Sequence, residues 1–313
     1  MRRLSRPQVK LPTLTVGAGA NQASRHLNDR LTDPAAKLTF RAHWNAPDVR
    51  GALYAMHGRV CAFCLSELTR GDRGDVEHFR PKSLYFWLAY DFENYVLSCL
   101  QCNRIFKNEH FPLAPGAHRV DHDHRGGLAQ EGRLFLDPVL DPVEDWLLVD
   151  QGDLLYFWRP APLLAEGSVE HARVTETRDW FQWNKDPDLT RARTDAIDGA
   201  LFDIERGNHA EARRRASRFR PHGGAVRNLL ASLEAIELPT AAEELDWLLE
   251  ELWQDWQWAK KIGGKLCEKK LEELAWAFAV LWKAPPPGGT TDLPEWLAQA
   301  GIKAQVEPKY KTL

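Results

Sequence analysis

The sequence lacks any apolar run long enough to cross a membrane. The longest, residues 274–282, is far shorter than the roughly 20 residues that a bilayer span requires. The start of the chain, MRRLSRPQVK, is basic but is not followed by the apolar segment of a secretory signal. We therefore expect a cytoplasmic protein without a membrane partner, in which cysteines stay reduced.

The chain also lacks a strong net charge, internal repeats and a phosphate-binding loop of the form GxxxxGK followed by Ser or Thr. Its net charge of −3 neither indicates nor excludes a nucleic-acid partner. Without the loop, any linked ATP hydrolysis must come from a partner. With 313 residues, 44% hydrophobic and 27% charged, the chain is an ordinary globular protein, long enough for two domains.

Charged residues are unevenly distributed. Residues 1–50 hold nine Lys and Arg against three Asp and Glu, six arginines lie within residues 205–220, and residues 243–255 are strongly acidic. Such segregation indicates either solvated helix faces or a dipolar surface whose basic side attracts polyanions.

Composition divides the chain into three parts. Residues 1–40 are basic and rich in Pro, Gly and polar residues, which predicts an extended N-terminal arm. Residues 41–125 carry aromatic and cysteine landmarks. Residues 126–313 are expected to be mainly helical, after a short hairpin around residues 151–153.

Two helices are expected near the end of the chain, where most of the 13 Trp residues also lie. Apolar residues recur at helical spacing over residues 245–256 and again over residues 271–282, with Gly263 and Gly264 between them and three prolines after them. An antiparallel helical pair is the simplest interpretation. The Trp-containing apolar stripes of these two helices either belong to the hydrophobic core or form a surface on which a partner docks.

Four of the five cysteines form two CxxC pairs, Cys61 with Cys64 and Cys99 with Cys102. Two such pairs can supply the four corners of a tetrahedral zinc site. A redox CxxC is the alternative, although one pair would suffice and no βαβ context surrounds either. The fifth cysteine, Cys267, is expected to be a buried apolar residue.

Between the two pairs lies DVEHFRPK, residues 75–82, and the second pair runs directly into Asn103. This order resembles the HNH endonuclease family, over about residues 60–112. The resemblance implies an α+β fold, with a ββα-metal HNH core at residues 41–125 that a four-cysteine zinc site braces and a largely α-helical region after it. It also implies an enzyme that hydrolyses the phosphodiester bonds of nucleic acid, DNA more than RNA.

The resemblance assigns roles within residues 75–78. His78 matches the general base, a role suited to an imidazole that titrates near neutral pH. Glu77 matches the metal ligand before it, although many relatives have Asp there. Asp75 is either a further ligand or a cap of the hairpin. Alternation along a strand places Asp75 and Glu77 on one face and Val76 and His78 on the other.

Further roles fall on Asn94, Asn103 and three cations. The resemblance implies that Asn103 is a second metal ligand and that Asn94 braces the loop. Lys107, one helical turn after Asn103, is expected to meet the scissile phosphate. Arg80 and Lys82 are either nucleic-acid contacts or solvated loop residues.

The catalytic divalent ion is expected to be Mg²⁺ or Mn²⁺, since the site offers oxygen and nitrogen with few protein ligands. Zinc or nickel at this second site is the alternative. The segment VDHDHRGG, residues 120–127, resembles the DHDH signature of another HNH branch but follows the second CxxC instead of preceding it. We interpret it as a polar loop near the site.

Residues 134–146 and 174–193 resemble the retron- and Septu-associated HNH proteins of the PtuB type, with Asn184, Leu189 and Arg193 as counterparts of that family's residues. This implies the effector nuclease of an anti-phage system, working with a PtuA-like ABC-type ATPase. The Trp-rich helices are then a candidate docking element. Two alternatives are a stand-alone McrA-like restriction nuclease and a zinc-braced nucleic-acid-binding module with a vestigial site.

Overall fold

The computed structural model describes residues 1–69, 73–152, 154–234 and 236–281. Its elements follow in this order: α1 (Pro12–Thr15), α2 (Ala18–Thr32), η1 (His43–Asn45), α3 (Pro47–His57), β1 (Asp75–His78), η2 (Phe86–Leu88), η3 (Phe92–Asn94), β2 (Tyr95–Ser98), η4 (Gln101–Lys107), η5 (Arg125–Gln130), α4 (Val143–Trp146), β3 (Leu147–Gln151), β4 (Tyr156–Pro160), α5 (Val169–Trp180), α6 (Pro187–Glu205), α7 (His209–Arg215), α8 (Gly223–Ser232), α9 (Ala241–Ile262) and α10 (Lys265–Leu281).

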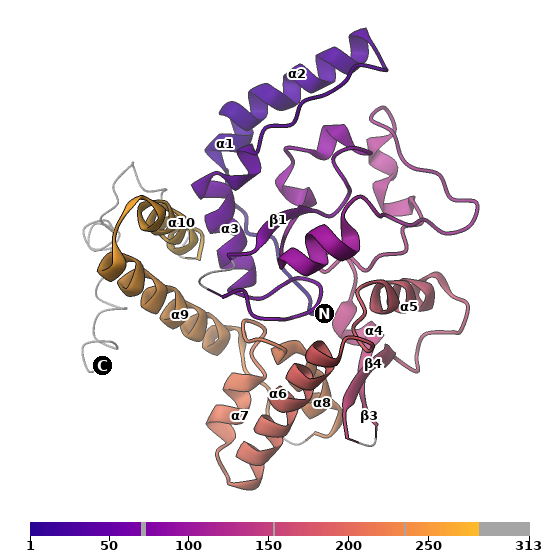
Figure 1. Ribbon diagram of the computed structural model, residues 1–313. Coiled ribbons are helices and arrows are strands. Elements are labelled where there is room, and N and C mark those ends of the chain that lie inside the picture. Colours follow the sequence, from indigo (N-terminus) through magenta and orange to yellow (C-terminus); the bar gives the residue numbers. More distant parts are fainter. Residues whose placement is uncertain (70–72, 153, 235, 282–313) are drawn as a thin grey trace.

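Helices dominate, and the strands form two separate antiparallel pairs, β1 with β2 and β3 with β4. This mixture is α+β, as expected. Figure 1 shows β1 near the centre, α2 at the top, α3 and α10 at one side, and α6, α7 and α8 at the bottom. Buried apolar side chains of α3, the two strand pairs, α5, α6, α8, α9 and α10 form one continuous cluster. Among the described residues, no helix has the length and apolarity of a membrane span.

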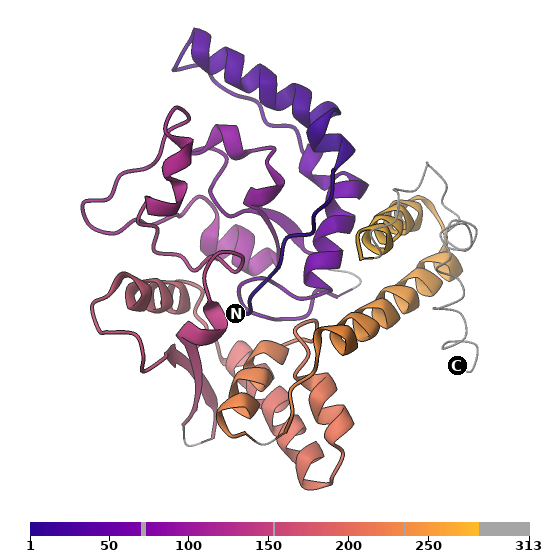
Figure 2. The same cartoon turned by 180° about the vertical axis from the view of Figure 1, so that it is seen from behind.

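The N-terminal residues do not form the expected extended arm. Residues 1–11 run along the back of the molecule from the N label up to α1 (Figure 2) and bury Leu4 in the core, and residues 18–32 form α2. The guanidinium of Arg2 is fully buried and donates to the carbonyl of His57. Local composition indicated an arm because the groups that bury this segment lie far along the sequence.

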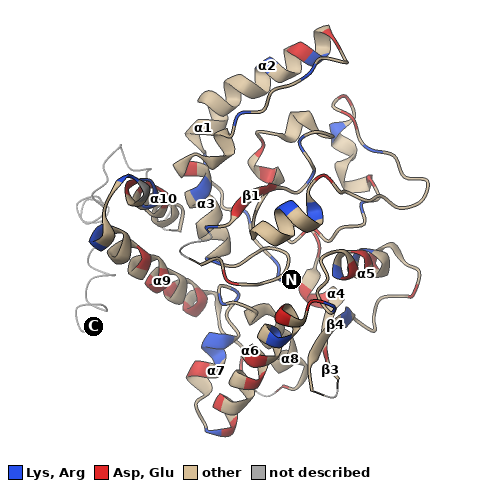
Figure 3. Ribbon diagram, in the orientation of Figure 1, with Lys and Arg blue, Asp and Glu red and all other residues tan. Residues whose placement is uncertain are grey.

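The basic and acidic runs of the second half face each other on neighbouring helices (Figure 3). Most arginines of residues 205–220 pair with a carboxylate of the chain: Arg213 with Glu243 at 2.5 Å, Arg214 with Glu250 at 2.6 Å, Arg215 with Asp203 at 2.7 Å, Arg218 with Glu144 at 3.0 Å and Arg220 with Glu251 at 3.2 Å. These five cations are therefore paired with carboxylates of the chain, which favours the interpretation of this run as helix faces with internal ion pairs.

The β3–β4 hairpin forms where the sequence predicted it, although residue 153 at its tip lies outside the described residues. The side chain of Asn184 holds Trp158 of β4 by both backbone groups, accepting from the N–H at 2.9 Å and donating to the C=O at 2.6 Å. Arg193 is buried and donates to the carbonyl of Tyr156 at 2.9 Å. Both residues therefore stabilise this hairpin.

The two predicted C-terminal helices are confirmed as α9 and α10, separated by Gly263 and Gly264. Both glycines have positive φ, which favours glycine over any other residue at this turn. Most of the apolar stripe residues of both helices, including Trp256 and Phe278, are buried, whereas Leu245 and Trp253 are half-buried and pack against the core. This burial favours the core interpretation. Trp282 and the prolines after it lie outside the described residues.

Helix α10 packs mainly against α3, at a point where only glycine fits. A Cβ on Gly51 would lie 2.3 Å from the Cβ of Trp276 and 2.5 Å from the carbonyl oxygen of Glu273. The two backbones therefore approach more closely than any side chain would allow, and this contact attaches the C-terminal helix to the cysteine-containing half of the chain.

We expect Gly51→Ala to lower the free energy of unfolding by about 1–3 kcal/mol or more, because the two helices must move apart. Denaturant unfolding measures this change. Gly126→Ala is the control, since a Cβ there meets nothing within 4 Å and ordinary surface changes stay within about 0.5 kcal/mol. Equal stability of the two variants would contradict the close approach.

Candidate functional site: a pocket beside a four-cysteine cluster

The β1–β2 pair brings DVEH next to the second CxxC. Asp75 pairs with Ser98 and His78 with Tyr95, in an antiparallel register that spans the whole of both short strands. Cys99 follows β2 directly, and the π-helix η4 begins at Gln101. The first CxxC attaches to the same strand, because Ala62 donates to the carbonyl of Leu97 at 2.9 Å.

The four paired cysteines converge on one point, as the sequence predicted. Their sulfur atoms all lie within 4.8 Å of one another, and the Sγ atoms of Cys64 and Cys99 are 3.8 Å apart. Tetrahedral zinc with bonds of about 2.3 Å would place its sulfurs about 3.8 Å apart. The cluster can therefore hold a metal ion such as zinc.

Backbone amides and neighbouring thiols stabilise one thiolate of this cluster, that of Cys61, whereas the pKa values of the Cys64 and Cys102 thiols are raised well above the ordinary value. The amides of Ser66 and Cys102 donate to the sulfurs of Cys64 and Cys99, at 3.5 Å and 3.4 Å. Burial alone would raise the pKa of the Cys61 thiol, but hydrogen bonds from the other three thiols hold its pKa well below the ordinary value. Metal ligation requires such thiolates. Cys267 is buried in α10, outside the cluster.

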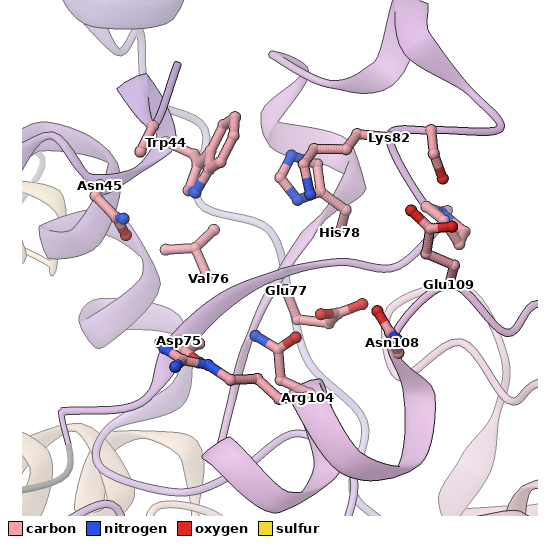
Figure 4. A pocket seen from close by; sticks show the side chains of 14 residues that line it. Trp44, Asn45, Asp75, Val76, Glu77, His78, Lys82, Arg104, Asn108 and Glu109 are labelled. Atoms are coloured by element: carbon pink, nitrogen blue, oxygen red, sulfur yellow. The ribbon is translucent and has the colours of Figure 1, made fainter. Parts of the chain in front are cut away.

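A pocket of about 350 Å³ opens beside this cluster, and polar side chains dominate its wall. Three segments line it: the stretch before α3, strand β1 with the loop after it, and the end of η4. The lining residues are Ala42, Trp44, Asn45, Asp75, Val76, Glu77, His78, Pro81, Lys82, Ser83, Asn103, Arg104, Asn108 and Glu109. In Figure 4, Trp44, His78 and Lys82 lie on one side of the strand, and Asp75 and Glu77 lie on the other.

His78 is held in one orientation. Its Nε2 donates to the carbonyl of Ala89 at 3.0 Å, and its ring packs edge-on against Trp44 at 4.7 Å and Tyr95 at 5.0 Å between centroids. Because a carbonyl only accepts, this hydrogen bond places the proton of the neutral ring on Nε2 and leaves a lone pair on Nδ1. Burial lowers the pKa of His78 to about 3, so the ring is neutral near pH 7 and does not titrate near neutral pH as the sequence suggested.

Glu77 forms a buried ion pair with Lys107. Nζ of Lys107 lies 2.6 Å from Oε1 of Glu77 and donates to the carbonyl of His78 at 3.0 Å. Burial raises the pKa of Glu77, although the ammonium group acts to lower it. Lys107 is fully buried, so it does not face an incoming phosphate as the helical spacing suggested. The side chain turns inward because the carboxylate lies on that side.

Asp75 and Asn103 also line the pocket. Arg104 contacts both carboxylate oxygens of Asp75, at 2.8 Å and 3.1 Å, so Asp75 is engaged with a cation of η4. The backbone N–H of Asn103 donates to the carbonyl of Cys99 at 3.0 Å, and this hydrogen bond positions Asn103. The same short helix thus presents Cys102 to the cluster and Asn103 to the pocket.

Asn94 has contacts of the kind expected of a bracing residue. Its side chain accepts from the amide of Arg80 at 2.8 Å and donates to the carbonyl of Arg80 at 2.9 Å and to that of Leu88 at 3.3 Å. It therefore fixes the turn that follows β1.

The expected cations of this segment separate into two kinds. Arg80 is buried and bonded to Glu131 at 2.9 Å and to the carbonyl of Leu128 at 3.1 Å, so it is neither a solvated residue nor a surface contact. Lys82 remains half-exposed at the pocket, with Nζ 5.5 Å from the ring centroid of Trp44. Arg80 is buried because its carboxylate partner, Glu131, lies close to it in the fold. Glu131 is 51 positions away in the sequence, so the local sequence could not show that Arg80 and Lys82 differ.

Sequence reasoning missed Trp44, Asn45, Asn108 and Glu109. Trp44 and Asn45 come from a turn before α3 that carries no motif, and the other two follow η4 at a bend where Asn108 has a positive φ of 43°. The segment VDHDHRGG forms a polar loop that leads into η5, and none of its residues lines the pocket near which the loop was expected.

The fold and the cysteine cluster together define an α+β protein with four thiols placed where they could hold a metal ion. Two curated proteins, each named Septu protein PtuB, resemble part of it. The one from Bacillus mycoides (strain KBAB4) is 29% identical over 124 residues, 36% of this chain and 41% of the relative. The one from Bacillus thuringiensis is 32% identical over 81 residues, 24% of this chain and 32% of the relative.

The chain thus spans less than half the length of the curated relatives that it matches. The partial similarities support a relationship with the Septu PtuB proteins. No family model matches the chain, and no solved structure matches it.

We expect the purified protein to contain about one zinc ion per chain, and Cys99→Ser to lose most of it together with several kcal/mol of stability. Elemental analysis and thermal unfolding, with and without a chelator, measure both quantities. Cys267→Ala is the control and should keep its zinc. Equal zinc contents of the two variants would show that the cluster is not the zinc site.

Proposed function

We propose that this protein is a metal-dependent HNH-type endonuclease that hydrolyses phosphodiester bonds, with DNA as the favoured substrate and RNA as the second. The observation that carries the proposal is His78, a neutral imidazole with a fixed tautomer in the wall of a polar pocket. Such a group, within reach of a water molecule, can act as a general base. An ordered strand pair followed by η4 supports the ββα-metal assignment.

In this proposal Nδ1 of His78 takes the proton of the attacking water. Asn94 keeps the turn after β1 in place, and Lys82 contacts a phosphate of the substrate. The fully buried Lys107 holds Glu77 and the carbonyl of His78 together instead of touching nucleic acid. Arg80 supports the same turn through Glu131.

Glu77 and Asn103 would hold the catalytic divalent ion. They supply one carboxylate and one amide oxygen, and Asp75 is already paired with Arg104. Among the described residues, only the cysteines bring three or more ligand atoms of His, Cys, Asp or Glu together. So sparse a set fits Mg²⁺ or Mn²⁺, which keep several waters and bind with the help of substrate phosphate. When bound, the ion would stabilise developing negative charge.

The defence role rests on the similarity to the Septu PtuB proteins. We propose that the chain is the effector nuclease of a Septu-type anti-phage system in the cytoplasm, working with a PtuA-like ABC-type ATPase. The absence of a P-loop from this sequence is in keeping with a separate ATPase subunit. The buried stripes of α9 and α10 leave their other faces to meet such a partner.

One observation favours a second function, a nucleic-acid-binding module with a vestigial site. Lys107 already neutralises Glu77 at 2.6 Å, and a carboxylate so paired is a poorer ligand for a cation. In that case the protein binds nucleic acid and does not cut it in the presence of Mg²⁺ or Mn²⁺.

We expect His78→Ala to lower cleavage of plasmid DNA at least about 100-fold, because general-base catalysis contributes that much or more. Gel assays with Mg²⁺ or Mn²⁺, on DNA and RNA, measure the rate. His26→Ala is a matched control: this buried histidine also bonds a backbone carbonyl, that of Thr39 at 3.1 Å, but does not line the pocket. Cleavage by His78→Ala at the wild-type rate would refute the assigned base.

We expect Lys82→Ala to affect DNA binding and Arg80→Ala to affect the stability of the fold. The first is expected to weaken DNA binding, to reduce the dependence of log K on log salt by about one, and to leave the melting temperature unchanged. The second should lower stability by about 3–5 kcal/mol, because it leaves Glu131 buried without its cation. Binding titrations at several salt concentrations and thermal unfolding distinguish the two. A loss of binding without a loss of stability in Arg80→Ala would overturn its assignment.

A further inference from the structure

The two residues before β1 are held by an arginine of α3. Arg50 donates to the carbonyl of Arg73 at 2.8 Å and to that of Gly74 at 3.2 Å, from a side chain that is itself buried. Tyr54, one turn along α3, donates to the same Arg73 carbonyl at 3.2 Å. The point at which β1 begins is therefore tied to α3 through backbone carbonyls.

The C-terminal helix supplies the anion of this network. Glu273 of α10 is fully buried. One of its carboxylate oxygens lies 3.3 Å from Nε of Arg50, and the other contacts the guanidinium of Arg73. A buried carboxylate that forms ion pairs with two arginines compensates both charges, and removing it leaves those charges without this counterion.

Geometry fixes where Glu273 can be. Gly51 follows Arg50 on α3, and its Cα lies so close to α10 that a Cβ would meet the carbonyl oxygen of Glu273 at 2.5 Å. Figure 1 shows α10 beside α3, next to the start of β1. Glu273 therefore lies both at the close backbone contact between α3 and α10 and in the buried ion network.

The position of Arg73 and Gly74 affects Glu77 and His78 directly, because β1 has only four residues, Asp75–His78. A movement at Arg73 and Gly74 has no length of strand over which to relax before it reaches Glu77 and His78. A misplacement of about 1 Å, caused far from the chemistry, can cost about 100-fold in rate.

We propose that Glu273 is a positioning residue of the nuclease pocket: acting from the C-terminal helix through Arg50 and Arg73, it holds the strand that carries Glu77 and His78. The residue lies almost 200 positions from that strand and does not line the pocket. Nuclease activity accordingly depends on α10 being docked on α3. The expected loss of nuclease activity rests on the proposed function. The expected loosening of β1 does not.

The test compares Glu273→Gln with Glu244→Gln. Glu244 is an equally buried glutamate of α9 that bonds two arginines, Arg218 and Arg227, and does not contact β1. Both variants remove one buried negative charge. We expect Glu273→Gln to lower kcat about 10- to 100-fold with KM within twofold of wild type, and Glu244→Gln to change kcat less than threefold at a similar loss of stability.

A second readout does not need activity. Amide hydrogen exchange of β1 should become faster in Glu273→Gln, and should stay at the wild-type rate in Glu244→Gln. If Glu273→Gln fails to fold, Arg73→Gln takes its place, since it removes only the partly exposed arginine and leaves the Arg50–Glu273 pair intact.

Each outcome has one meaning. Faster exchange in β1 together with a lower kcat supports the positioning role. Faster exchange in a protein whose wild type cuts no nucleic acid refutes the nuclease and retains the positioning role. Unchanged exchange in β1, or equal losses of kcat in the two glutamate variants, overturns the proposal.

Discussion

The convergence of four thiols on one point is the constraint on which the rest of the site depends. Two of them follow α3 and two follow β2, so a shared metal ion would tie the helix, the strand and η4 into one unit. β1 is then placed by pairing with β2, and η4 by its own cysteine. The pocket lies between those two elements, and its shape follows from the same constraint.

Buried charge is the second organising feature. Lys107, Arg80 and Arg50 are buried beside or beneath the pocket, and each has a carboxylate partner: Glu77, Glu131 and Glu273. A buried cation without such a partner would be strongly destabilising. The partners lie 30 or more positions apart in the sequence, and one of the pairs, Arg50 with Glu273, joins α3 to the C-terminal helix α10. Lys82 has no buried role and remains at the pocket surface.

The sequence revealed the features that local spacing encodes. Two CxxC pairs predicted the thiol cluster, helical periodicity predicted α9 and α10, and two apolar stretches around a Gly predicted the β3–β4 hairpin. The sequence did not reveal which polar side chains are buried, because their burial depends on partners that are distant in the sequence. Burial of Leu4 and Arg2 in the core, and the inward turn of Lys107, depend on groups brought close only by folding. For the same reason Trp44 was missed, although it packs directly against His78.

The central claim is that a divalent cation binds in this pocket, with Glu77 and Asn103 as its protein ligands. The most direct measurement is anomalous X-ray scattering from crystals that contain Mn²⁺ and a non-hydrolysable DNA oligonucleotide. We expect an anomalous peak within bonding distance of both oxygens, with His78 facing a phosphate of the oligonucleotide. A well-ordered oligonucleotide in the pocket without such a peak, or a peak bound by other residues, would contradict it.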